Sequence, residues 1–295
     1  MTAETKLDRV GVVVHPRRDI DDAMDRLRAW ADAAGAEIVQ VQMPGVDRVV
    51  AEPATAESCD LVAALGGDGT TLAALHAAGP AGRPVLGVAC GSLGALTATS
   101  GDQVDDALRA IGAGDWQPRR LPGIAVAAEA AEPVVALNDF VVVRKGASQI
   151  AVAIEVDGEL FIRFAGDGIV IATPLGSSAY TMAAGGPIIA PGTDSIVLTP
   201  LAPHGGTCPP LVVGCESELR VTIEPGWYGA RAELDGHVHD LPGSTLSMTW
   251  RAGHATLVTL AGAETLLTGL RRRRILMDSP RVLARDDRAP SVTRR

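Results

Sequence analysis

One carboxylate surrounded by glycines is the first feature of this sequence that suggests chemistry. Residues 65–75 read LGGDGTTLAAL, in which Asp68 lies between Gly67 and Gly69 and is followed by two threonines. Glycine permits tight turns and lets an anion approach the backbone amides. A helix that begins here would present free N–H groups to that anion. The pattern therefore predicts either a simple strand–helix turn or a phosphate-binding loop with its own carboxylate.

Within this motif, Asp68 separates the two interpretations. A carboxylate beside a bound phosphate is unfavourable unless it binds Mg²⁺ or accepts a proton from the hydroxyl that is being phosphorylated. Thr70 would be either the N-cap of the following helix or a phosphate ligand through its hydroxyl. If the segment is only a turn, Asp68 is a solvated turn residue.

Residues 166–189 form a second candidate for ligand binding. They read GDGIVIATPLGSSAYTMAAGGPII, in which an apolar run passes into a segment of Thr, Pro, Gly, Ser and one tyrosine. Small hydroxyl residues beside glycine offer hydrogen bonds with little bulk, which suits a polyhydroxylated, charged ligand. The alternative is an ordinary long loop between sheets.

The elements around GGDGT alternate between strand and helix patterns. Apolar runs typical of strands covered on both faces occur at 9–15, 36–41, 59–65 and 83–89. Helical spacing of apolar residues occurs at 19–35, 70–79 and 101–115. This alternation predicts a doubly wound parallel sheet, in which ligands bind beyond the carboxyl ends of the strands. Asp68 follows one of those ends.

Farther along the chain, the pattern changes to short β-rich segments separated by Gly, Pro and Asp. Strands are expected at 123–130, 133–143, 150–164, 167–174, 219–225, 230–236, 244–250 and 255–260. An Asp-Gly pair in EVDGEL predicts a hairpin. We therefore expect an α/β domain at 1–118 and a mainly antiparallel β domain at 119–261. A helix at about 262–278 is expected to return to the first domain, and 279–295 to be a loose tail.

Composition and charge narrow the class of partner. The net charge of −9 argues against general binding of nucleic acid or anionic membranes. No apolar run approaches the roughly 20 residues of a membrane-spanning helix. The sequence starts without a signal-peptide pattern and its four cysteines are scattered, so we expect a cytoplasmic protein.

Lysine is scarce in this chain, and no metal-binding pattern is present. The chain has only two lysines, Lys6 and Lys145, and no G-x-x-x-x-G-K-[ST] loop. The RRRR run at 271–274 is expected to be a solvated helix end rather than a phosphate patch. Histidines and cysteines show no metal-binding spacing, so no protein-bound metal and no tightly bound prosthetic group are expected.

Together these motifs resemble those of the NAD kinase (ATP-NAD kinase) family. GGDGT at 66–70, LNDFVVVRKG at 137–146 and DGIVIATPLGSSAYTMAAGGP at 167–187 occur in the family's order. The opening VGVVVHPRRD also looks like the family's first strand. GGDGT alone is shared with diacylglycerol and sphingosine kinases, whereas the block at 167–187 is specific. The resemblance covers about residues 9–275 and implies an NAD kinase-like fold.

The resemblance also implies roles for individual residues. Asp68 would be the catalytic carboxylate that takes the proton from the 2′-hydroxyl of the adenosine ribose. Donor phosphates would be held by Gly66, Gly67, Gly69 and Thr70. Asn138 and Asp139 would hold ribose hydroxyls, and Asp167 would face the nicotinamide amide. The NAD site would be completed by Thr173, Ser178, Ala179 and Tyr180, with a core aromatic as the alternative for Tyr180.

Departures from the family pattern bear on the acceptor. Where the family has Asn, Phe, Glu and often Ser, this chain has Ala89, Ala95, Asp139 and Ala183. The stretch PHGGTCPP keeps His204 but has two prolines where the family has Arg-Pro. Each lost contact would cost about 1–3 kcal/mol if it was buried. The catalytic motif is intact, whereas the identity of the acceptor stays open.

The expected function is transfer of the γ-phosphoryl group of ATP, as its Mg²⁺ complex, to the 2′-hydroxyl of NAD. One alternative is a kinase of the same fold that phosphorylates another small hydroxyl compound. Another is a catalytically silent dinucleotide-binding regulator, and a lipid kinase ranks third. Polyphosphate as donor and NADH as acceptor stay open. The resemblance implies a homodimer or homotetramer.

Overall fold

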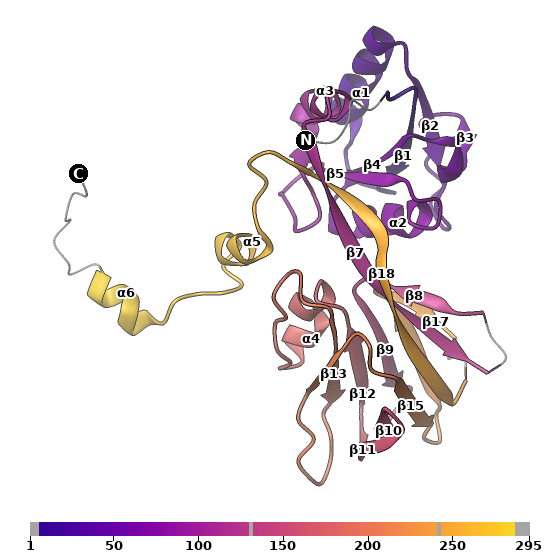
Figure 1. The fold of residues 1–295 in the computed structure, drawn as a ribbon, viewed down its shortest axis with the longest axis vertical. Coiled ribbons are helices and arrows are strands. Elements are labelled where there is room, and N and C mark those ends of the chain that lie inside the picture. Colours follow the sequence, from indigo (N-terminus) through magenta and orange to yellow (C-terminus); the bar gives the residue numbers. More distant parts are fainter. Residues whose placement is uncertain (1–5, 130–131, 241–242, 287–295) are drawn as a thin grey trace.

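The chain folds into two lobes, which the computed structural model describes for residues 6–129, 132–240 and 243–286 (Figure 1). The N-terminal lobe contains a parallel sheet and the C-terminal lobe is mainly antiparallel, which confirms the expected fold class. Two long strands, β7 (Trp116–Ala128) and β18 (Thr245–Leu260), run through both lobes. None of the helices in the described ranges is long and apolar enough to cross a membrane.

The N-terminal sheet has the strand order β2-β1-β4-β5, with β3 outside β2 and β6 beside β5. All pairings among these strands are parallel. The strands are β1 (Arg9–Val14), β2 (Glu37–Val41), β3 (Pro53–Ala54), β4 (Leu61–Gly66), β5 (Pro84–Ala89) and β6 (Thr99–Ser100).

Helices cover both faces of this sheet, which is why its central strands are apolar throughout. Helices α1 (Asp21–Ala34) and α3 (Val104–Gly112) pack on one face through side chains such as Leu27 and Leu108. Helix α2 (Asp68–Ala78) packs on the other face through Leu75. Since β2 and β4 lie on opposite sides of β1, the strand order reverses beside β1. Doubly wound folds bind ligands at such a switch point.

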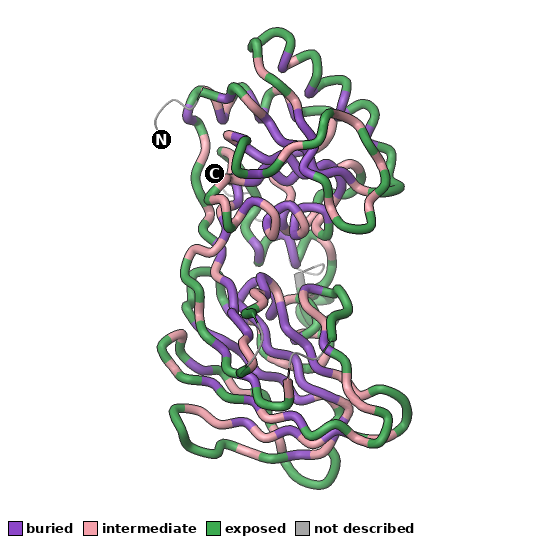
Figure 2. Tube along the Cα trace, turned by 90° about the vertical axis from the view of Figure 1, so that its right-hand side faces the viewer, coloured by how far each residue is buried: buried purple, intermediate pink, exposed green. Residues whose placement is uncertain are grey.

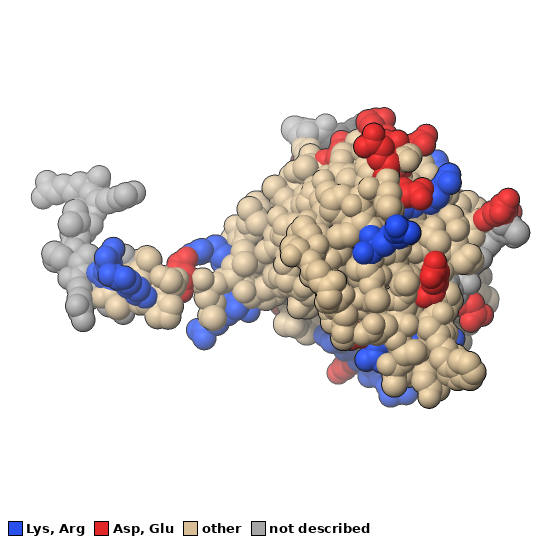
Figure 3. Space-filling view, turned by 90° about the horizontal axis from the view of Figure 1, so that it is seen from below, with Lys and Arg blue, Asp and Glu red and all other residues tan. Residues whose placement is uncertain are grey.

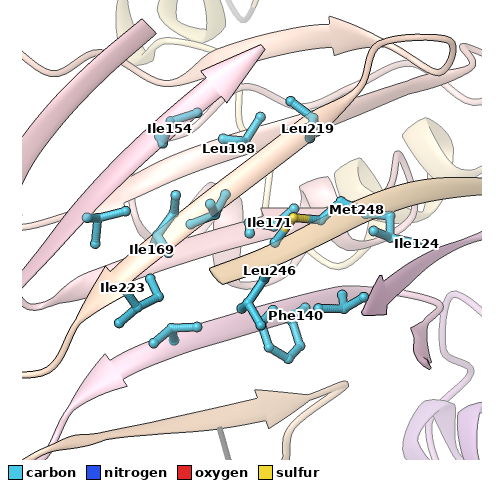
Figure 4. Close-up of a cluster of buried hydrophobic side chains, with 14 of the residues drawn as sticks. Ile124, Phe140, Ile154, Ile169, Ile171, Leu198, Leu219, Ile223, Leu246 and Met248 are labelled. Carbon is cyan, nitrogen blue, oxygen red and sulfur yellow. The ribbon is translucent and has the colours of Figure 1, made fainter. Parts of the chain in front are cut away.

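The C-terminal lobe is a sandwich of two sheets. One sheet has the order β14-β13-β12-β9-β16-β17; the other contains β11-β10-β15-β18, with β7 beside β18 and β8 beside β7. Apolar side chains from both sheets fill the space between them, including Phe140, Ile171, Leu246 and Met248 (Figure 4). The strands are β8 (Val134–Ala136), β9 (Asp139–Arg144), β10 (Ile150–Val156), β11 (Glu159–Gly166), β12 (Gly168–Ala172), β13 (Ser195–Leu201), β14 (Leu211–Gly214), β15 (Leu219–Glu224), β16 (Ala230–Leu234) and β17 (His237–His239).

The paired strands β7 and β18 join the lobes. They pair antiparallel over nearly their whole length, and β18 also pairs parallel with β5. The two strands expected at 244–250 and 255–260 are therefore one strand, because a bulge between Arg251 and Ala255 breaks the apolar pattern without ending the ladder. The expected domain boundary at 118 falls within β7. Buried segments occur in both lobes (Figure 2).

The last described residues, which include helix α6 (Pro280–Asp286), form an arm that projects from the body (Figure 1). Helix α5 (Leu266–Arg272) is capped by the Thr265 hydroxyl, and its Leu270 is 1% exposed, so this helix packs on the body. Residues 280–286 of the expected loose tail form helix α6, and 287–295 lie outside the described residues. Basic side chains lie along the arm (Figure 3).

Candidate active site

Asp68 is the first residue of α2 and follows the carboxyl end of β4, beside the switch point. The N-cap is Gly67, so the suggestion that Thr70 is the N-cap is wrong. Thr70 lies in the first turn and is buried, and a Cβ at Gly66 would lie 2.2 Å from the Thr70 hydroxyl. Gly66 is therefore required by close packing. The first amides of α2 lack partners within the helix, as at any helix start, and can receive an anion.

The Asp68 carboxylate is held by the loop after β5. The amide of Ala95 donates to Oδ2 at 2.9 Å and the amide of Leu96 donates to Oδ1 at 2.8 Å. A Cβ at Gly94 would lie 2.0 Å from Oδ1, so this loop approaches the carboxylate as closely as glycine permits. The side chain is still 41% exposed. Each carboxylate oxygen has further lone pairs, so Asp68 is oriented and can still accept a proton.

Arg273 lies next to Asp68 in the candidate site, and the sequence did not predict this contact. Its Nη1 lies 3.8 Å from Asp68 Oδ2, whereas Arg271 pairs with Asp278 and Arg272 with Glu264. The run at 271–274 is therefore only partly a solvated helix end. A cavity of about 350 Å³ lies beside this contact and is lined by Gly94 and Arg273, among other residues. The available signal was a run of four arginines at the end of the expected helix, in a chain with two lysines.

The segment 137–139 leads into β9 and lies against the block at 167–187. Thr173 donates its hydroxyl to the Leu137 carbonyl at 2.6 Å and its amide to the Asn138 carbonyl at 2.9 Å. A Cβ at Gly176 would lie 2.0 Å from the Asn138 carbonyl oxygen. The structure thus brings together Asn138, Asp139 and Thr173, as the sequence suggested, and explains the glycine at 176.

Asp139 differs from Asn138 in exposure. Asn138 is half-buried, whereas Asp139 is 6% exposed. Burial raises the pKa of the Asp139 carboxyl to about 7, with smaller contributions from the charges of Asp235 and Glu233. Asp139 is therefore partly protonated at neutral pH, and can then both donate and accept hydrogen bonds.

The segment 178–180 follows Thr173 and Gly176 in the sequence and turns outward. Ser178 donates to the Leu175 carbonyl at 3.2 Å, Ala179 is exposed, and Tyr180 begins the short helix α4 (Tyr180–Ala183). Tyr180 is 38% exposed, so it is not a core aromatic. Its ring is available to a ligand.

Asp167 lies apart from the other predicted NAD-site residues. It precedes β12, whereas Asp139 is opposite Ala172 at the far end of that strand. Five residue steps correspond to about 17 Å along a strand. Arg144 at the end of β9 pairs with Asp167, with Nε 2.6 Å from Oδ1. Within one chain, Asp167 is therefore separated from Asn138 and Asp139, and its role stays a prediction.

Comparisons with known proteins agree with these features. The family model for the ATP-NAD kinase N-terminal domain matches residues 10–116, and that for the ATP-NAD kinase C-terminal domain matches residues 137–241. An NAD kinase of Chlorobaculum tepidum is 32% identical over 240 residues, which cover 79% of this chain and 84% of the relative. An NAD kinase of Nocardia farcinica is 38% identical over 227 residues, covering 71% of this chain and 69% of the relative.

Solved structures share the fold. An NAD kinase from Archaeoglobus fulgidus in complex with ATP has a TM-score of 0.68 at 26% identity, covering 90% of this chain and 96% of that chain. The structure of yeast NADH kinase complexed with NADH has a TM-score of 0.76 at 21% identity and covers 94% of this chain and 90% of that chain. At this identity the likeness is one of fold. This protein is thus an ATP-dependent phosphotransferase. The chain belongs to the ATP-NAD kinase family.

Proposed function

We propose that this chain transfers the γ-phosphoryl group of ATP to the 2′-hydroxyl of NAD and forms NADP. The observation that carries the proposal is the Asp68 carboxylate at the N-terminus of α2, which the amides of Ala95 and Leu96 orient and which is still exposed. It would take the proton of the 2′-hydroxyl as the hydroxyl oxygen attacks the γ-phosphorus and the bond from phosphorus to the β–γ bridging oxygen breaks. ADP leaves with the electron pair of that bond.

The donor phosphates would bind at the start of α2. The amides of Gly67, Gly69 and Thr70, together with the partial positive charge of the helix N-terminus, suit an anion there. Mg²⁺ would enter with the nucleotide, since the described ranges hold no group of three or more His, Cys, Asp or Glu side chains that could bind a metal. Arg273 would supply positive charge where lysine is absent.

The acceptor would bind against 137–139 and the block at 167–187. Asn138 and Asp139 would hold ribose hydroxyls, with Thr173 supporting the segment and Ser178, Ala179 and Tyr180 lining the site. Asp167 would contact the nicotinamide part only if the acceptor reaches about 17 Å along β12 from Asp139. This assignment follows the residues that match the family motifs.

A second candidate is the same transfer to another small hydroxyl compound. The burial of Asp139 favours it, because a 6% exposed carboxyl offers little surface to a ribose. The presence of Ala95 in place of the family's Phe does not favour another acceptor. Ala95 holds Asp68 through its backbone amide, which any residue except proline supplies.

NADP formation from ATP, Mg²⁺ and NAD by the purified protein tests the function. We expect turnover by the wild type and a fall in kcat of about 10²–10⁴-fold in Asp68→Asn, because the amide cannot accept the proton. The variant should keep its melting temperature within a few degrees, as measured by circular dichroism. Asp47→Asn, which changes an exposed carboxyl in the same way, is the control.

The alternatives predict other outcomes. Consumption of ATP only with a different hydroxyl compound would identify another acceptor. Tight binding of NAD or NADP without turnover, and no effect of Asp68→Asn, would identify a regulator. Well-folded wild type that forms no NADP would contradict the leading proposal.

Location and assembly are part of the proposal. We propose a cytoplasmic location, with which the four free cysteines are compatible. A homodimer or homotetramer is proposed from the family, and light scattering on the purified chain measures it.

A further inference from the structure

Asp235 is a buried carboxylate that the proposed transfer does not use. It lies in the turn between β16 and β17, and its side chain is 1% exposed. Its backbone has φ 50°, a left-handed conformation that Asp adopts in Asp-Gly hairpin turns, and Gly236 follows it. A carboxylate is buried only where hydrogen bonds or opposite charge replace its water. The contacts of Asp235 therefore explain why it is there.

Three consecutive backbone amides donate to Asp235. Leu137 donates to Oδ2 at 2.8 Å, and Asn138 and Asp139 donate to Oδ1 at 2.7 and 2.9 Å. The Asp235 amide donates in return to the Asp139 carbonyl at 2.9 Å. One side chain thus sets the backbone of the whole 137–139 segment, on which the proposed ribose contacts lie.

The fourth contact comes from the other lobe. His76 Nε2 lies 2.6 Å from Asp235 Oδ2, and the His76 side chain is 29% exposed. His76 is in the last turn of α2, the helix whose first residue is Asp68. At about 1.5 Å per residue, the two positions are about 12 Å apart along the helix axis. Leu75 and Leu137 belong to one apolar cluster, which also joins α2 to this segment.

The charges around this contact come from several elements. Asp139 on β9 is near both Asp235 and Glu233 of β16, and Glu233 pairs with Arg231. His254 on β18 faces His76; burial lowers the pKa of His254, and His76 and Arg251 lower it further. The His76 ring nitrogen gives Asp235 Oδ2 a hydrogen-bond partner in addition to the Leu137 amide.

We propose that His76 and Asp235 are positioning residues that couple α2 to the 137–139 segment. By joining the far end of α2 to this segment, the pair holds an acceptor bound at 137–139 at a set distance from the Asp68 carboxylate. Neither residue touches the reacting atoms. The inference rests on the proposed function for the identity of the acceptor.

Steady-state kinetics of His76→Phe and His76→Gln test the proposal. Phe keeps a ring but cannot bond to Asp235, whereas Gln places an N–H group at a similar reach. We expect His76→Phe to lower kcat/KM for NAD by about 10–100-fold, since small misplacement is costly in catalysis, while KM for ATP changes by less than about twofold. His76→Gln should recover most of the loss. His237→Phe, the same change at an exposed histidine beyond the same turn, should match the wild type.

Hydrogen exchange on the free protein provides a readout that needs no turnover. In His76→Phe, the amides of Leu137, Asn138 and Asp139 should exchange about 10-fold faster, because their acceptor loses a fixing contact, while amides of β10 and β15 keep their rates. Wild-type kinetics and wild-type exchange in His76→Phe would overturn the proposal. An equal rise in both KM values with a lowered melting temperature would also overturn it, since that indicates a purely structural role.

The two readouts separate this inference from the proposed function. If the wild type forms no NADP but exchange at 137–139 responds to His76→Phe, the function is wrong and the coupling stands. If the wild type forms NADP and His76→Phe changes neither kinetics nor exchange, the function stands and the coupling is wrong.

Discussion

At the scale of single residues, backbone amides hold two carboxylates of this chain that differ in their exposure. Asp68 accepts two amide hydrogen bonds and is 41% exposed, so a substrate hydroxyl can still reach it. Asp235 accepts three and is 1% exposed, so it can only organise its surroundings. The same chemical group therefore suits two different tasks, and exposure decides which.

Gly94→Ala tests whether the orientation of Asp68 matters. The added Cβ would lie 2.0 Å from Oδ1, and the carboxylate, as the end of a flexible side chain, has to move away. We expect a small change in the free energy of unfolding and a fall in kcat of about 100-fold, because the proton acceptor is misplaced. Urea denaturation and NADP formation measure the two quantities. Gly214→Ala, where a Cβ meets nothing within 4 Å, is the control and should leave both unchanged.

Asp139→Asn tests the burial of that carboxyl through pH. Its pKa is about 7 in the folded chain against an ordinary value of 3.8, so between these values the folded state keeps a proton that the unfolded state has lost. The free energy of unfolding of the wild type should therefore fall as pH rises from about 4 to about 7, and then level off. Asn does not ionise and avoids this loss.

We expect the free energy of unfolding of Asp139→Asn, relative to that of the wild type, to increase between pH 4 and pH 8. The increase should reach a few kcal/mol, because each pKa unit corresponds to about 1.4 kcal/mol. Asp47→Asn, at an exposed carboxyl, should show no such trend. A difference independent of pH would mean that Asp139 ionises normally in the folded chain.

At the scale of elements, helix α2 connects both halves of the site. Its N-terminus carries Asp68 and its last turn carries His76, which contacts the turn beside β16. The end of helix α5 lies against the Asp68 side of the site. Arg273 approaches Asp68 there, and Arg272 donates to the Leu93 carbonyl at 3.3 Å. The site is therefore assembled from the ends of elements distant in sequence.

Arg273→Ala tests the contribution of the segment after α5. If Arg273 binds donor phosphates, kcat/KM for ATP should fall by about 10–100-fold, as expected for loss of a hydrogen bond to a charged group. KM for NAD should change little, and Arg273→Lys should recover part of the loss because it keeps the charge. Arg271→Ala removes an exposed arginine that pairs with Asp278 and is the control. An unchanged KM for ATP in Arg273→Ala would remove this residue from the donor site.

At the scale of the whole molecule, the lobes share a sheet. The antiparallel sheet that contains β18 continues into the parallel sheet through the pairing of β18 with β5, and β7 pairs with β18 across the junction. The contact of His76 with Asp235 adds a polar link between the lobes. Relative movement of the donor and acceptor sides is therefore restricted by backbone pairing as well as by side chains.

The sequence alone determined the features that depend on local pattern. Apolar runs and helical spacing predicted the doubly wound lobe, and GGDGT predicted the strand–turn–helix that carries Asp68. The Asp-Gly hairpin and the order of motifs indicated the β-rich lobe and the family. These signals are contained in short contiguous stretches, so they can be read without coordinates.

Only the tertiary structure decided which distant groups meet. The sequence indicated neither that a bulge carries β18 through both lobes nor that α2 begins at Asp68 with Gly67 as its cap. His76 and Asp235 are 159 residues apart, and no local pattern pairs them. Their contact depends on how α2 and the turn after β16 pack, and the burial of Asp235 then makes a polar partner necessary for its carboxylate.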